Sequence, residues 1–152
     1  MNANTDPDFA PIATRIRDSV GRQGFMIHIG AELSELTRGM CTLAVDRRPE
    51  LLQQNGLFHG GVTAFLVDNA TTIAAAASRG QSALTAEYKL NLLSTGERLI
   101  CRARVIKPGR QVAVVAADVF CVTDGVEEHT ATALASIAML DEKAAAKMPS
   151  PA

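Results

Sequence analysis

The chain has 152 residues, and its 15 Lys and Arg against 16 Asp and Glu leave a net charge of -1. This length is enough for one domain that buries its core without disulfides or metals. Because the charge is nearly balanced, the usual electrostatic basis for binding nucleic acid or an acidic membrane is absent, and a small molecule or another protein is the expected partner.

The first predicted element is an amphipathic helix. Asp6 and Pro7 suit the cap and the first position of a helix, and apolar side chains then recur at spacings of three and four. These side chains are Phe9, Ile12, Ile16 and Val20. The helix is expected to end near Gly21 or Gly24, so that residues 1–24 form an N-terminal helical region.

Residues 25–45 predict the first two strands. Ile, Leu and Val alternate with polar residues in this segment, and the Thr-Arg-Gly sequence at residues 37–39 interrupts the pattern as a hairpin turn does.

A long helix and a sheet are predicted for most of the remaining chain. After a connection at residues 49–58, the helix spans residues 61–78 and ends at Gly80. Four strands follow, at residues 84–93, 98–107, 111–122 and 127–140. Turn residues separate them in the manner of a meander, at positions 94–96, 108–109 and 124–125. Residues 143–152 are rich in alanine and proline and are expected to be a flexible tail.

This order of elements predicts an α+β fold in which an antiparallel sheet wraps around a long central helix. The sequence contains no internal repeat and no linker, so residues 25–142 are expected to form a single domain. The helix is shorter than the roughly 18 uninterrupted apolar residues that indicate a membrane span, and Asp68 and Asn69 lie in its middle. It is therefore predicted to be a core helix.

Asp68 is the most unusual residue of that helix. The helix is apolar on nearly all sides and is expected to be surrounded by protein. A carboxylate in such surroundings must find partners or have its pKa raised, and acids of this kind are candidates for functional sites. The alternative is a modest polar stripe that faces solvent or a neighbour, made of Asp68, Asn69, Thr71 and Thr72.

His59, Gly60 and Gly61 precede the helix. Two successive glycines lower helix stability, which suggests that another group approaches the backbone closely. Unpaired N–H groups and the positive end of the helix dipole meet here and suit a developing oxyanion. The alternative is a flexible start of the helix without a functional role.

The spacing between these two features implies a second chain. Asp68 follows His59 by nine residues, which is about 13 Å along a helix, so the two cannot act together on one carbonyl group. Two antiparallel copies of the helix across a twofold axis would bring Asp68 of each chain beside His59 and Gly60 of the other. We therefore expect a homodimer with two composite sites.

Several segments together resemble the PaaI-like thioesterases of the hotdog superfamily, over about residues 26–140. The most specific is QQNGLFHGG at residues 53–61 followed by Asp68-Asn69-Ala70, and TAEYKLNLL at 85–93 and KPGR at 107–110 are also similar. The resemblance implies a hotdog fold and an acyl-CoA thioesterase that needs no cofactor, acting on an aryl thioester of the phenylacetyl-CoA type or on a medium-chain one. It also favours a tetramer built from two dimers.

The resemblance also implies roles for individual residues. Asp68 would attack the thioester or activate a water, and the backbone N–H of Gly60 would hold the carbonyl oxygen. His59 would shape the site. Gln53 stands where many relatives carry Asn, and it would orient the carbonyl or the attacking water. Thr85 matches a hydroxyl that assists this water, although a β-branched residue also suits a plain strand position.

Substrate-binding residues are expected from the same resemblance and from side-chain chemistry. Phosphate groups prefer cationic side chains and exposed turn amides, which indicates Lys107 and Arg110 for the CoA nucleotide. Apolar side chains such as Phe65 would line the acyl pocket. The expected set is Asn55, Gly61, Phe65, Lys107, Gly109 and Arg110.

The cysteines and two further histidines receive structural interpretations. Cys41, Cys101 and Cys121 are widely spaced among apolar residues without a CxxC pair, so buried thiols are expected. His28 and His129 are isolated within predicted strands and lack the spacing of metal ligands, so no metal site is expected. The N-terminus has neither the basic start nor the apolar stretch of a signal peptide, which favours a cytoplasmic location.

Two alternatives to thioester hydrolysis are considered. Hotdog domains also occur as non-catalytic acyl-CoA binders, which the presence of Asp68 disfavours. A hotdog hydratase or dehydratase acting on enoyl thioesters would pair Asp and His on a differently placed motif, which this sequence does not contain.

Overall fold

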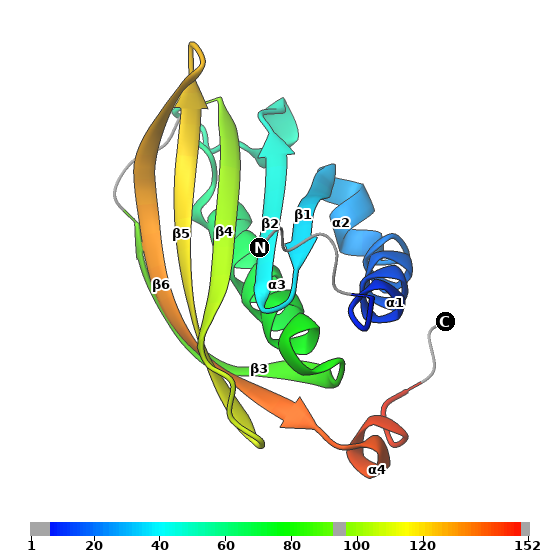
Figure 1. The fold of residues 1–152 in the computed structure, drawn as a ribbon. Helices are drawn as coiled ribbons and strands as arrows, with labels where there is room; N and C mark the ends of the chain where they lie inside the picture. Colours follow the sequence, from blue (N-terminus) through cyan, green and yellow to red (C-terminus); the bar gives the residue numbers. More distant parts are fainter. Residues whose placement is uncertain (1–6, 93–96, 150–152) are drawn as a thin grey trace.

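The computed structural model describes residues 7–92 and 97–149. Six strands form one antiparallel sheet in the order β1-β2-β4-β5-β6-β3. The long helix α3 (Gly60–Arg79) lies along one face of this sheet and contacts all six strands (Figure 1). The predicted α+β architecture, a sheet curved around a long helix, is confirmed.

The N-terminal helix begins later than predicted. Helix α1 (Ala10–Val20) has Phe9 at its N-cap and Pro11 in its first turn, whereas Pro7 lies in a turn before the helix and Asp6 lies outside the described residues. Proline is tolerated in the first turn because its missing N–H has no partner there in any case. The predicted apolar face does pack against the core, through Phe9, Ile12, Ile16 and Val20.

A short helix replaces the start of the first predicted strand. Helix α2 (Gly24–Ile29) buries Met26 and Ile29, which are three residues apart and so lie on one helical face. The prediction of a strand from residue 25 is therefore wrong, and His28 lies on a helix.

The strands themselves lie close to their predicted positions. β1 (Ala31–Thr37) and β2 (Met40–Asp46) form the predicted hairpin. The later strands are β3 (Ser82–Leu92), β4 (Arg98–Lys107), β5 (Val112–Thr123) and β6 (Val126–Leu140). The 3-10 turn η1 (Pro49–Leu51) precedes α3, and helix α4 (Glu142–Ala145) follows β6, largely in the segment that was expected to be a flexible tail.

The later strands do not form a simple meander. β4, β5 and β6 are sequential neighbours, but β3 pairs with β6 at the edge of the sheet, so β5 and β6 separate it from β4. The turn predicted at residues 94–96 lies outside the described residues. Turn-forming residues accompany a crossover as readily as a hairpin, which is why their presence could not decide the pairing.

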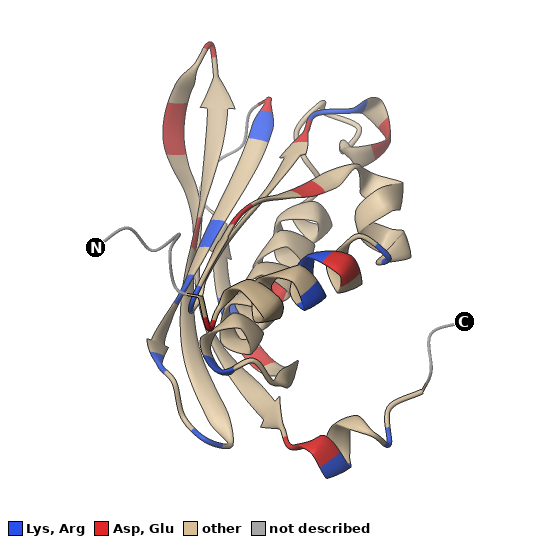
Figure 2. Ribbon diagram, turned by 45° about the vertical axis from the view of Figure 1, so that its right-hand side comes forward, with Lys and Arg blue, Asp and Glu red and all other residues tan. Residues whose placement is uncertain are grey.

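Charged residues of both signs are spread over the molecule (Figure 2). This distribution agrees with the nearly balanced net charge. Within residues 7–92 and 97–149, none of the helices, α3 included, combines the length and the hydropathy needed to cross a bilayer.

Candidate active site

His59 caps α3 through its imidazole ring. Its backbone is extended, with φ of -67° and ψ of 133°, and its Nδ1 accepts a hydrogen bond from the Gly61 N–H at 3.0 Å. The His59 carbonyl oxygen accepts from the Val62 N–H at 2.9 Å. Because Nδ1 is an acceptor, a neutral ring carries its proton on Nε2, and the exposed side chain offers an N–H donor to its surroundings.

The N–H of Gly60 is left without an acceptor. Gly60 is the first residue of α3, where backbone N–H groups have no partner within the helix, and no other group in the described parts of the chain accepts from it. A Cβ at Gly60 would lie 3.2 Å from Cδ1 of Leu92, so another side chain does approach the backbone here. Residues 59–61, which form the HGG corner, thus present a free backbone N–H at the positive end of the helix dipole.

The loop before the HGG corner is held by two amide side chains. Gln53 Nε2 donates to the Phe58 carbonyl oxygen at 2.9 Å, directly beside the corner. Asn55 Oδ1 accepts from the Leu57 N–H at 3.3 Å. Gln53 is therefore close to the predicted site within its own chain, whereas exposed Asn55 stabilises the turn.

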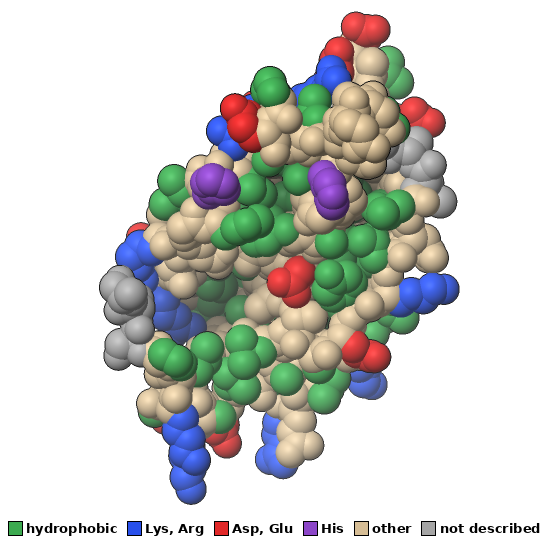
Figure 3. Space-filling view, turned by 180° about the vertical axis from the view of Figure 1, so that it is seen from behind, with side chains coloured by type: hydrophobic (Ala, Val, Ile, Leu, Met, Phe, Trp, Pro, Cys, Tyr) green, Lys and Arg blue, Asp and Glu red, His purple; other side chains and the backbone are tan. Residues whose placement is uncertain are grey.

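Asp68 lies on the open side of α3. Its side chain is half-buried, as are those of Asn69 and Thr72, whereas Thr71 is fully buried and does not belong to this stripe. A single chain therefore does not surround the helix as predicted, because its sheet covers only one side of α3. Figure 3 shows a face of the molecule where hydrophobic side chains gather around an acidic group.

The Asp68 carboxylate is unpaired within the chain. Among residues 7–92 and 97–149, no hydrogen bond or ion pair reaches it, and the hydroxyl groups of Thr71 and Thr72 contact the backbone oxygen of Asp68 instead. Neighbouring Asn69 is engaged differently, since its Nδ2 donates to Gln23 Oε1 at 2.9 Å. Asp68 is thus the acidic group of this stripe that has capacity for a further partner.

Thr85 of β3 lies beside the turn of α3 that follows Asp68. Its hydroxyl oxygen is 2.7 Å from that of Thr72, and the Thr72 hydroxyl is 3.0 Å from the backbone oxygen of Asp68. The fold therefore links Thr85, through the Thr72 hydroxyl, to the backbone of the residue predicted to be the catalytic acid.

The HGG corner and Asp68 remain apart within one chain. Helix α3 is uninterrupted from Gly60 to Arg79, so their separation of about 13 Å along the axis is maintained. A reaction that uses both groups requires a second copy of the chain.

A cavity that the sequence did not indicate adjoins the HGG corner. It measures about 550 Å³ and lies between α2, η1 and the start of α3, with Phe25, Leu51, His59 and Val62 among its lining residues. Phe25 is 55% exposed and packs on Phe65 of α3, with 4.6 Å between ring centroids. A signal for α2, which forms one wall of this cavity, was present in the sequence. Between Gly24 and Gly30, the apolar residues Met26 and Ile29 are three positions apart, as they are on one face of a helix.

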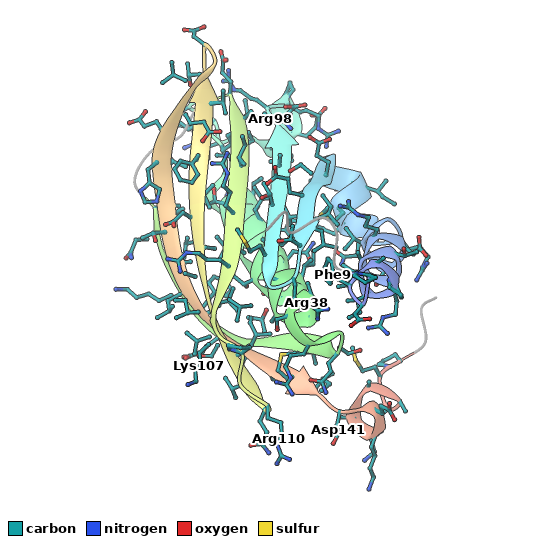
Figure 4. The ribbon with its side chains drawn as sticks, in the orientation of Figure 1. Phe9, Arg38, Arg98, Lys107, Arg110 and Asp141 are labelled. Carbon is teal, nitrogen blue, oxygen red and sulfur yellow. The ribbon has the colours of Figure 1, made fainter. Side chains whose placement is uncertain are left out.

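Lys107 and Arg110 do not lie near the HGG corner of their own chain. Both are exposed at the β4–β5 turn, at the opposite end of the sheet from Arg98 (Figure 4). The loop that leads to α3 adjoins the Arg98 end, where the Arg47 N–H donates to the Glu97 carbonyl oxygen at 2.8 Å. Glycine is required at position 109 for a structural reason, because a Cβ there would lie 2.0 Å from the carbonyl oxygen of Val112.

The three cysteines and His129, which were expected to have structural roles, lie in β-strands away from the HGG corner. Cys41, Cys101 and Cys121 are buried as predicted, and burial raises the pKa of all three thiols. His129 lies on β6 as expected, but its Nε2 is 3.1 Å from Asp118 Oδ1, a pairing that its sequence spacing did not suggest.

Comparison with known proteins identifies the family. The family model of the thioesterase superfamily matches residues 55–128. A thioesterase family protein from Silicibacter pomeroyi superposes with a TM-score of 0.81 at 35% identity, over 85% of this chain and 98% of that one. The chain belongs to the thioesterase superfamily. Membership confirms the expected family and hotdog fold, and it supports hydrolysis of an acyl thioester in general terms.

Two further solved structures share the fold. The PaaI protein of E. coli, from the phenylacetic acid degradation operon, has a TM-score of 0.75 at 16% identity and covers 86% of this chain and 94% of its own. A thioesterase from Haemophilus influenzae has a TM-score of 0.71 at 18% identity, with coverages of 84% and 90%. At these identities the similarity concerns the fold alone. No curated protein matches this sequence.

Proposed function

We propose that the protein is an acyl-CoA thioesterase that hydrolyses an aryl or medium-chain acyl-CoA to the free acid and CoA. The observation that carries this proposal is the unpaired, half-buried carboxylate of Asp68 on the helix whose first N–H, at Gly60, is also unpaired. An acid and an oxyanion donor are the two groups that hydrolysis of a thioester needs most. Membership of the thioesterase superfamily supports this assignment.

The proposed enzyme is a homodimer with two composite sites. Antiparallel α3 helices across a twofold axis would place Asp68 of one chain beside Gly60 of the other. The edge strand β3 supports this arrangement, because its outer edge pairs with no described strand, and its apolar side chains Leu84, Tyr88 and Leu92 are exposed. Exposed edges of this kind are normally paired or protected, so we propose that β3 pairs with its own copy. Two such dimers would form the expected tetramer.

The reaction proceeds on the thioester carbonyl group. The Gly60 N–H donates to the carbonyl oxygen as that oxygen gains negative charge. Asp68 of the other chain attacks the carbonyl carbon, or it accepts a proton from a water that does so. In the water route the C–S bond then breaks, and the CoA thiolate takes the proton held by Asp68. The carboxylate is thereby restored. In direct attack, CoA leaves as the thiolate while an anhydride forms between Asp68 and the acyl group; water then hydrolyses this anhydride, the thiolate takes a proton from that water, and the free acid and the Asp68 carboxylate are released. Neither route uses a metal or an organic cofactor.

The remaining site residues position the reacting groups. The Nε2–H of His59 is directed away from its own helix cap and is assigned to the substrate. Gln53 keeps the Phe58 carbonyl in place and orients the thioester or the water. The hydroxyl of Thr85 contacts the attacking water.

The cavity beside the HGG corner is assigned to the acyl group. Its volume of about 550 Å³ and the apolar side chains in its lining, Phe25, Leu51 and Val62 among them, suit an aryl or medium-chain group, although Arg48 and Glu50 also line it. Phe65 does not line the cavity but packs against Phe25 at its side. Gly61 lines the same cavity. Lys107, Gly109 and Arg110 at the β4–β5 turn are assigned to the CoA phosphates, and Asn55 to the edge of the substrate site.

The cytoplasm is the proposed location of the enzyme. Its cysteines are all free, with none of the disulfides that oxidising compartments favour.

Thiol release from a panel of acyl-CoA esters tests the proposed function. The wild-type chain is expected to release CoA, and Asp68→Asn is expected to lower kcat about 100-fold to 10,000-fold, because an amide can neither attack nor accept the proton. Absence of release by the wild type, or equal release by Asp68→Asn, would refute the proposal. Tight binding without turnover would instead indicate an acyl-CoA binder, and loss of enoyl absorbance without thiol release would indicate a hydratase.

A further inference from the structure

Two threonine hydroxyl groups join α3 to β3 beside Asp68. Thr72 Oγ1 is 2.7 Å from Thr85 Oγ1 and 3.0 Å from the backbone oxygen of Asp68. Both threonine side chains are half-buried. Thr72 follows Asp68 by one helical turn, so the two side chains are neighbours on the same side of α3.

A single arrangement of the two hydroxyl protons satisfies both contacts. A carbonyl oxygen can only accept, so the contact with the Asp68 backbone oxygen uses the one proton of Thr72. The contact between the hydroxyls must then use the proton of Thr85, with Thr72 as the acceptor. A bond from a helical threonine to the carbonyl four residues earlier is a common arrangement. Thr85 can therefore only accept a hydrogen bond from any further partner.

We propose that Thr72 is a positioning residue that makes the Thr85 hydroxyl an acceptor for the attacking water. In this arrangement Thr85 accepts one O–H of the water, and Asp68 removes the other proton as the oxygen attacks the thioester carbon. Two acceptors on different elements hold the water in one orientation. The inference rests on the proposed thioester hydrolysis and selects the water route over direct attack by Asp68.

Thr71 provides a matched control on the same helix. Its hydroxyl donates to the backbone oxygen of Val67 at 2.8 Å, and the same hydroxyl oxygen lies 3.1 Å from the backbone oxygen of Asp68. Its side chain is fully buried, and within the described part of the chain its hydroxyl contacts only backbone oxygens of α3. The substitution Thr71→Val therefore removes a helix back-bond of the same type without changing the partner of Thr85.

A double-mutant cycle on kcat tests the proposal. Thr85→Val is expected to lower kcat about 10-fold to 100-fold, with KM little changed, because the water loses one of its two acceptors. Thr72→Val is expected to lower kcat about 3-fold to 10-fold, and to have no further effect when Thr85 is already Val, since it acts only through that hydroxyl. Thr72→Ser should regain most of the rate, and Thr71→Val should keep it.

Two results of this cycle would overturn the inference. One is an additive loss in the double variant, which would mean that Thr72 acts independently of Thr85. The other is an equal loss of kcat in Thr71→Val, which would mean that any missing back-bond disturbs α3. Melting temperatures measured for all variants separate loss of stability from loss of water positioning.

The positions of the two hydroxyl protons can also be measured directly, without any turnover of substrate. Neutron diffraction from crystals grown in D₂O locates the hydroxyl deuterium atoms. Deuterium on Thr85 directed at Thr72 supports the inferred arrangement, and deuterium on Thr85 directed elsewhere overturns it. An inactive wild-type chain would refute the proposed function and with it the positioning of an attacking water, whereas a deuterium on Thr85 directed elsewhere in an active enzyme would overturn this inference alone.

Discussion

Gly60 can be changed so that one N–H is removed while the helix is kept. Proline suits the first position of a helix, and it requires an extended residue before it, which His59 already is, with ψ of 133°. We therefore expect Gly60→Pro to fold and to lose about 100-fold to 1,000-fold in kcat, the range measured for removal of one oxyanion donor. Steady-state kinetics together with circular dichroism would test this.

Gly60→Ala is the control for this prediction. It adds a Cβ near Leu92, 3.2 Å from a flexible side-chain end, but it keeps the N–H. Its loss of kcat should be clearly smaller than that of Gly60→Pro. Equal losses would mean that the added bulk, rather than the missing donor, impairs the enzyme.

The identities of residues 59–61 predicted the free N–H of Gly60 but not the hydrogen bond that the His59 ring makes beside it. The two glycines and the following apolar run placed Gly60 at the start of a helix, because helix starts follow local rules. The capping role of the His59 ring was not anticipated, since histidine is not among the usual N-cap residues.

At the scale of elements, the end of α3 depends on a left-handed glycine packed against α1. Gly80 has φ of 67°, and a Cβ there would lie 2.9 Å from Cδ1 of Ile12. We expect Gly80→Ala to lower the free energy of unfolding by about 2–4 kcal/mol, from the left-handed backbone and the steric overlap together. Urea denaturation would measure this loss.

A second glycine separates the two causes. Gly125 has φ of 77° with no atom within 4 Å of an added Cβ. Gly125→Ala should therefore cost only the backbone part, about 1–2 kcal/mol. A loss as large as that of Gly80→Ala would argue against packing between α1 and α3 as the additional cause.

For the whole molecule, composite sites predict that two inactive variants restore each other. When Asp68→Asn and Gly60→Pro chains are refolded together, a heterodimer has one site with both the intact acid and the intact N–H. Random pairing makes half of the dimers mixed, with one of two sites intact, so about a quarter of wild-type activity should return. Affinity tags of two kinds would quantify the heterodimer, and heterodimers without activity would contradict a shared site.

The sequence alone determined the order of the six strands and the long helix along the chain, the start of that helix to within one residue, and the distance from His59 to Asp68. These features depend on residue spacing and on the fixed rise of a helix, which are local properties. The tertiary structure decided three others: β3 at the sheet edge, α2 beside Phe65, and the contact of Thr72 with Thr85. Each of these joins segments that are not adjacent in the chain, and such pairings depend on how the whole core packs rather than on any local pattern.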